Sequence, residues 1–140
     1  MRYLLDTNVI SEAMKPRPDV GVGEWLRSQP ANSLAISVLT LGEIWKGVEL
    51  MADGARRRTL EQWVETELPQ QFRHRLLPVD DETAVEWGRL AADSRKTGRE
   101  LPVIDGLLLA TAAVHGLTLV TRNLRDCDGR GVDVLNPWSA

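Results

Sequence analysis

The fold is decided by a stretch near the N-terminus, Tyr3-Leu4-Leu5-Asp6-Thr7-Asn8-Val9-Ile10. Its apolar start predicts a short buried strand. Asp6, Thr7 and Asn8 are all residue types that can cap the short helix expected over Val9–Met14. A strand that passes within one turn into a helix is typical of α/β proteins.

The same alternation continues along the chain. Further strands are expected at Leu34–Ile36, Leu76–Val79, Leu117–Val120 and, more weakly, Val132–Leu135. Helical patterns are expected at Val20–Ser28, from Leu41 to a stop at Gly54, at Ala55–Arg75 with a kink or end at Pro69, at Asp80–Thr97 and at Ile104–His115. Short apolar runs between longer helical patterns favour an α/β fold with a parallel sheet. No repeat or long linker divides residues 1–140, so we expect a single domain.

Composition excludes several classes of protein. The net charge of -3 argues against nucleic-acid binding by bulk electrostatics, so any RNA or DNA contact needs a local site, a metal or a partner. Cys127 is the single cysteine, which rules out an intramolecular disulfide and a cysteine zinc site. No apolar run approaches the ~18 residues of a membrane span, and the first residues do not resemble a signal peptide. We therefore expect a cytoplasmic protein without membrane association.

Four positions carry polar groups where a ligand could bind. Asp6 directly follows the first strand, and Glu43 lies early in an amphipathic helix. Asp105 begins the most apolar helical stretch, and the turn Thr121–Asp126 follows the strongest strand. Each has a plain alternative, because Asp6 and Asp105 could cap helices, Glu43 could be a surface acid and the turn could be an ordinary loop. Gly106 is expected to leave the Asp105 carboxylate accessible.

These positions can converge at one edge of the sheet. Ligands of parallel α/β sheets bind at the carboxyl ends of the strands. Clustered carboxylates repel one another unless a cation lies among them, and oxygen ligands without His or Cys select Mg²⁺ or Mn²⁺. Such a cation can activate water and stabilise charge on a phosphoryl group, which points to metal-assisted phosphodiester hydrolysis.

The ordered motifs resemble those of PIN-domain ribonucleases, and within them the FitB-like branch of the VapC toxins of type II toxin–antitoxin pairs. The N-terminal motif is Leu4-Leu5-Asp6-Thr7-Asn8-Val9-Ile10-Ser11-Glu12. Glu43 and Asp105 match the second and third acids of the family, and Thr121-Arg122-Asn123 matches its Thr-x-Asp or Thr-x-Asn motif. Asn136-Pro137-Trp138 matches the C-terminal ending of the branch. The resemblance covers the full chain.

The resemblance implies a three-layer α/β/α sandwich around four or five parallel strands. It also implies Mg²⁺- or Mn²⁺-dependent endonucleolytic cleavage of RNA, a VapB-type antitoxin, a homodimer, and contact with operator DNA only through the antitoxin. An amphipathic antitoxin helix is expected near Trp25 and Trp45. The expected roles are catalytic for Asp6, Glu43, Asp105, Asn123 and Asp126, metal-binding for Asp6 and Asp105, site-supporting for Thr7, Asn8 and Thr121, and RNA-binding for Arg122 and Arg125.

One position departs from the family, because many relatives carry Asp where this chain has Asn123. Asn can still coordinate a cation through its carbonyl oxygen, and Asp126 could supply charge one helical turn later. The departure leaves open a degenerate PIN fold that acts as a non-catalytic protein-binding module. An aspartate-nucleophile phosphatase is disfavoured, because Asn8 stands where that chemistry needs a second Asp as general acid.

Overall fold

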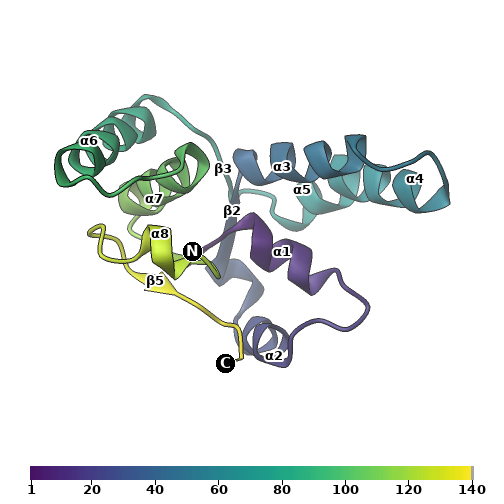
Figure 1. The fold of residues 1–140 in the computed structure, drawn as a ribbon. Coiled ribbons are helices and arrows are strands. Elements are labelled where there is room, and N and C mark those ends of the chain that lie inside the picture. Colours follow the sequence, from purple (N-terminus) through teal and green to yellow (C-terminus); the bar gives the residue numbers. More distant parts are fainter. Residues whose placement is uncertain (140) are drawn as a thin grey trace.

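The computed structural model describes residues 1–139 and is an alternation of strands and helices (Figure 1). The strands are β1 (Tyr3–Leu5), β2 (Leu34–Ser37), β3 (Leu76–Leu77), β4 (Thr118–Val120) and β5 (Val134–Leu135). The helices are α1 (Thr7–Ala13), α2 (Val20–Ser28), η1 (Ala31–Ser33), α3 (Val38–Glu49), α4 (Ala55–Gln62), η2 (Trp63–Glu67), α5 (Leu68–Gln71), α6 (Asp81–Thr97), α7 (Val103–His115) and α8 (Leu124–Cys127). Within the described chain, no helix combines the length and apolar character needed to cross a bilayer.

The five strands form one parallel sheet in the order β3-β2-β1-β4-β5. The central strand is β1, where Tyr3 pairs with Leu34 of β2 on one side and with Thr118 of β4 on the other. Because all strands run the same way, their carboxyl ends lie along one edge. This arrangement confirms the predicted α/β fold with a parallel sheet.

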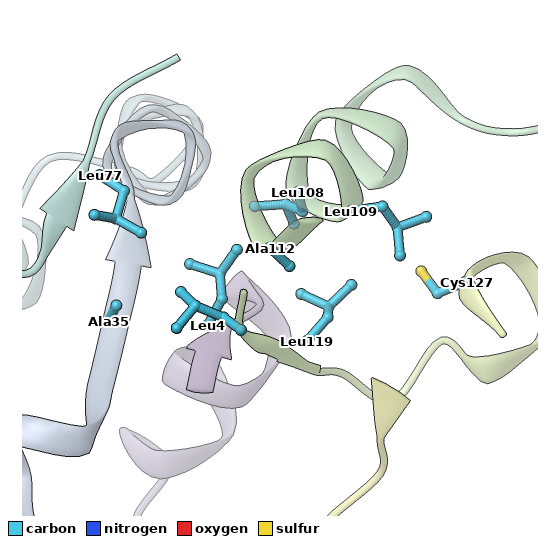
Figure 2. Close-up of a cluster of buried hydrophobic side chains, with 9 residues drawn as sticks. Leu4, Ala35, Leu77, Leu108, Leu109, Ala112, Leu119 and Cys127 are labelled. Carbon is cyan, nitrogen blue, oxygen red and sulfur yellow. The ribbon is translucent and has the colours of Figure 1, made fainter. Parts of the chain in front are cut away.

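One face of the sheet is covered by α6 and α7. Leu4 of β1 and Leu119 of β4 are fully buried there against Leu108 and Leu109 of α7 (Figure 2). Cys127 is buried in the same cluster, where it packs among apolar side chains. Burial raises the pKa of its thiol to about 12, so it is held as an inert neutral group.

The opposite face is covered by α1, α2 and the η2–α5 segment. Successive residues of a strand point to opposite faces, so Leu5, Ile36 and Val120 are buried on this side. They pack against Val9 and Val22, together with residues of η2 and α5. Helices on both faces make the three-layer sandwich that the resemblance implied.

Two helices differ from their predicted bounds by three residues or more, and one of these, α3, also ends at Glu49, before the stop predicted at Gly54. The third α-helix begins at Val38 rather than Leu41, because the Ser37 hydroxyl caps it by accepting from the Leu39 N–H at 3.0 Å. The helix expected over Ala55–Arg75 ends earlier, at Gln71, and Pro69 does not end it. A π-helical turn precedes the proline, and the wider turn accommodates the residue that lacks an N–H donor.

Gly106 has a different role from the one predicted. It is buried, and a Cβ at this position would stand 3.0 Å from the ring of Trp87 on α6 and 3.2 Å from Leu101. The glycine therefore allows α6 and α7 to pack closely, and it does not act by exposing Asp105. Close packing here fixes the N-terminal turn of α7, which carries that carboxylate.

Candidate functional site

Asp6 and Thr121 meet where two central strands end. Leu5 pairs with Val120 in the sheet, so the residue after each lies beside the other. The Thr121 hydroxyl donates to Asp6 Oδ2 at 2.7 Å, and the Asp6 side chain is only 7% exposed. Asp6 stands at the N-cap position of α1 without a side-chain capping bond. The Asp6 carboxylate therefore faces the Thr121 hydroxyl at the edge of the sheet, and the backbone N–H groups of Thr7 and Asn8 also lower its pKa.

Glu43 reaches the same place from the second turn of α3. The Thr7 hydroxyl donates to Glu43 Oε1, and the buried Thr40 hydroxyl lies 3.2 Å from the Thr7 oxygen. Thr40 was not predicted as a site residue. It precedes Glu43 by three residues, and this helical spacing places both on one face of α3.

Asn123 connects two further carboxylates. Its Nδ2 donates to Asp105 Oδ2 at 3.0 Å and to Asp126 Oδ2 at 2.9 Å. Its backbone N–H donates to the Thr121 hydroxyl at 3.0 Å, which ties this group to Asp6. Asn123 caps α8 by position only, since its side chain makes no capping bond. The predicted acids and their supporting residues therefore form a polar network of two hydrogen-bonded groups. One group holds Asp6, Asn8, Asp105, Thr121, Asn123 and Asp126, and the other holds Thr7, Thr40 and Glu43.

Burial and mutual repulsion shift the pKa values of two acids upward. Burial is the main cause for Asp105, whose pKa rises to about 6, and the negative charges of Asp6, Asp126 and Glu43 add to it. The Asn123 hydrogen bond opposes that rise. Burial also raises the pKa of Asp6, against the lowering effect of the Thr121 hydrogen bond. Carboxylates that resist ionisation in this way are stabilised by a nearby cation.

The donor chemistry fits a hard divalent cation. The side chains of the network are carboxylates, hydroxyls and amides. Their oxygen atoms are the kind of ligand that Mg²⁺ and Mn²⁺ prefer. The Asn8 Nδ2 donates to the Thr121 hydroxyl at 3.3 Å, while its buried Oδ1 has no hydrogen-bond partner within residues 1–139. No three Asp, Glu, His or Cys side chains of the described residues are already arranged as a metal cage. Ligands would have to move together on binding.

The network opens into a cavity of about 480 Å³. Its lining residues are Asp6, Thr7, Asn8, Ser11, Glu12, Lys15, Glu43, Asp105, Arg122, Asn123 and Trp138. Among the predicted RNA-binding residues, Arg122 lines the cavity, and Arg125 is exposed outside that lining. Asp126 also lies outside the lining and reaches the site through Asn123. The sequence did not predict three of the lining residues, Ser11, Glu12 and Lys15. They border the cavity only because α1 and the residues after it pack near the C-terminal segment.

A mainly apolar groove of about 630 Å³ adjoins this cavity between α1, α3 and α4. Thr7, Ser11, Lys15 and Glu43 line both hollows. The groove is otherwise lined by Met14, Pro16, Ile44, Gly47, Val48, Met51, Arg56, Thr59 and Leu60. Neither of the tryptophans expected near a partner helix lines this groove. One of them, Trp25, packs edge-on against Tyr3 at 4.9 Å.

Comparison with known proteins finds one family and several full-length relatives. The family model for the PIN domain matches residues 3–127. Toxin FitB of Neisseria gonorrhoeae is 35% identical over 96% of this chain and 97% of its own length. VapC ribonuclease Y4jK of Sinorhizobium fredii is 34% identical over 96% of both chains. The solved structure of FitAB bound to an IR36 DNA fragment matches with a TM-score of 0.92 and 33% identity over 99% of this chain and 96% of that one.

Proposed function

Since the chain belongs to the PIN-domain family, we propose that it is an endoribonuclease toxin of a toxin–antitoxin pair. It hydrolyses RNA phosphodiester bonds with a divalent metal and is neutralised by a VapB-type antitoxin. The observation that carries the proposal is the convergence of Asp6, Glu43 and Asp105 on one cavity. The similarity to proteins named as a toxin and as a ribonuclease supports it.

Asp6 and Asp105 would hold the Mg²⁺ or Mn²⁺. When bound, such a cation offsets the negative charge of the carboxylates and of the phosphate in the transition state. The high pKa of Asp105 supports this role, because the cation relieves the repulsion that causes part of that shift. The unpartnered Asn8 Oδ1 supplies a further neutral oxygen beside Asp6.

Glu43 would orient the attacking water and accept its proton. Its carboxylate lines the cavity and one of its oxygens is held by the Thr7 hydroxyl. The other oxygen is left for water. A carboxylate fixed in this way is suited to general-base catalysis, since positioning precedes proton transfer.

The adjoining groove would receive the antitoxin. Its apolar lining suits the apolar face of an amphipathic helix. Because the groove and the acidic cavity share four lining residues, a partner seated in the groove can extend an Arg into the cavity. An Arg in the cavity would pair with the carboxylates in bidentate geometry and displace the cation.

Growth of cells that express the chain tests the proposal. Expression of the wild-type chain alone should arrest growth, and co-expression of its genomic neighbour should restore it. Asp6→Asn should be harmless at equal soluble expression. Purified wild-type protein should cut RNA with added Mn²⁺ and stop when EDTA is added. A harmless and RNA-inactive wild-type chain would support the non-catalytic binding module instead.

Two further properties are proposed from the family resemblance. Two copies of the chain would form a homodimer, which the mass of the purified protein in solution would test. Operator DNA would be contacted only through the antitoxin, so the free chain should not shift an operator fragment in a gel. The structure of FitAB with a DNA fragment supports the second point.

A further inference from the structure

The C-terminal segment crosses the molecule and is tied down at its end. After β5 the segment runs back, as far as residue 139, to the start of α2 (Figure 1). The Ser139 N–H donates to Asp19 Oδ2 at 3.0 Å, and its hydroxyl donates to Asp19 Oδ1. A Cβ on Gly21 would stand 2.6 Å from Pro137 O and from Ser139 N. The close approach of these residues fixes the course of the segment.

This course places Trp138 in the wall of the acidic cavity. The indole lines the cavity and is half-buried, so part of its surface is accessible. Its backbone N–H donates to Asn136 Oδ1 at 3.0 Å. The Arg122 guanidinium lies over the indole ring, with Cζ 5.4 Å from the ring centroid. The guanidinium covers part of one ring face and the indole also packs against the core, so the accessible surface is shared between the exposed ring and the guanidinium. Bases in single-stranded RNA sites stack both on aromatic rings and on guanidinium planes.

Arg122 also supplies the charge that the cavity lacks. RNA phosphates are repelled by carboxylates, so substrate binding needs cations beside them. Two basic side chains line the cavity, Lys15 and Arg122. Lys15 is paired with Glu12 at 2.9 Å, whereas Arg122 makes no ion pair with any carboxylate of residues 1–139. Its position over an aromatic ring holds the charge in place without neutralising it.

We propose that Trp138 and Arg122 form a subsite for the nucleotide next to the scissile phosphate. Trp138 stacks on the base, and Arg122 contacts the adjoining phosphate. The subsite rests on the proposed ribonuclease function and adds to it a substrate requirement, namely an unpaired nucleotide beside the cut. Stacking on a ring accepts any base and favours large purines, so the subsite selects single-stranded over double-stranded RNA.

Binding of an RNA analogue that cannot be cut tests the subsite apart from catalysis. The probe is a set of short fluorescent 2′-O-methyl oligonucleotides, single-stranded or annealed, measured by anisotropy with Mg²⁺. Trp138→Leu should weaken single-strand binding at least about tenfold, because it removes one base stack. Trp138→Phe keeps a stacking face and should retain most of the affinity. Arg122→Ala should weaken binding. It should also reduce the slope of log affinity against log salt concentration by about one, because one fewer counterion is released.

Arg89→Ala is the matched control, because Arg89 is an exposed arginine of α6 that pairs with Glu86 away from the cavity. It should bind as the wild type does. Thermal melting of each variant reports whether it folds. Arg122 is exposed, so its removal decides the question even if the Trp138 variants fail to fold.

The outcomes separate the subsite from the function on which it rests. Wild-type affinity in both Trp138→Leu and Arg122→Ala, or no binding of any oligonucleotide by the wild type, overturns the subsite. Loss of antitoxin binding alone in these variants also overturns it and assigns Trp138 to the partner. Oligonucleotide binding that depends on Trp138 and Arg122, without any RNA cleavage, would instead overturn the ribonuclease proposal and leave the pair as a single-strand binding surface only.

Discussion

The two halves of the acidic site hold their carboxylates by different means. Asp6 and Glu43 each accept a hydrogen bond from a threonine hydroxyl, Thr121 and Thr7 respectively. Asp105 and Asp126 share a single donor, the Asn123 amide. A hydroxyl can rotate and release an oxygen lone pair, whereas the planar amide fixes both of its protons at once.

The two halves differ in how they keep their carboxylates available to a cation. The hydroxyl-held half can release the bonded oxygens of Asp6 and Glu43 by rotation of one hydroxyl each, whereas the Asn123 amide bonds Asp105 through Oδ2 alone. The amide-held half brings two acids close together without placing a further charge between them. This half therefore limits the repulsion among the carboxylates when no cation is bound.

The largest expected effect comes from removing one carboxylate in each half. Asp6→Asn and Asp105→Asn should both abolish RNA cleavage and weaken Mn²⁺ binding, because each removes a proposed ligand. Both should fold, and relief of repulsion should raise the melting temperature without metal. Asp93→Asn, at an exposed position of α6, is the control and should cleave normally. Cleavage by both site variants at the wild-type rate would refute the assignment of Asp6 and Asp105.

A smaller loss of cleavage rate is expected from a change at Glu43, which is proposed to position only the attacking water. Glu43→Gln keeps the shape of the side chain and its bond to Thr7 but removes the charge. The rate of cleavage should fall at least about a hundredfold, the usual contribution of a positioned general base. The KM for RNA should change little, because Glu43 is not assigned to substrate binding. A Gln variant as fast as the wild type would make Glu43 a surface acid.

The sequence predicted the sheet and the main acids because both depend on local patterns. Short apolar runs before Asp6 and Thr121 are enough to place them at strand ends, and parallel pairing brings them together. The predicted ends of two helices, at Thr97 and His115, are each followed by a glycine with positive φ, Gly98 after α6 and Gly116 after α7. The positions of the site residues on these elements therefore follow from the spacing of apolar and polar residues along the sequence.

Other features depend on contacts between distant segments. Trp138 reaches the cavity only because Ser139 is tied to Asp19, a pairing with no local signal. Gly106 was expected to expose a carboxylate, yet its role depends on Trp87 of another helix. The helix likewise continues beyond Pro69 through a π-helical turn at Trp63–Glu67, and no pattern in the sequence predicts that turn.

A further carboxylate at position 123 would sharpen the contrast between the halves. Asn123→Asp replaces the amide donor with a charge between Asp105 and Asp126. Without metal, the free energy of unfolding should fall by about 1 kcal/mol, a typical cost for a disturbed polar network. Added Mn²⁺ should raise the melting temperature more than in the wild type, because binding stabilises the folded state. Equal melting temperatures with and without metal in both proteins would contradict this account of Asn123.

The smallest expected effect is the pH dependence that Asp105 contributes to folding stability. The pKa of Asp105 rises to about 6 in the folded protein from an ordinary value of 3.8, so between these values the folded state retains a proton that the unfolded state releases. Folding stability without metal should therefore decline as pH rises through this range, by the linkage of proton binding to unfolding. Asp105→Asn cannot ionise and lacks this decline. The melting temperatures of the two proteins in EDTA should be similar near the lower value and should separate as the pH rises to the higher one, above which the variant stays more stable by a constant amount. A constant difference across the whole range would contradict the raised pKa of Asp105.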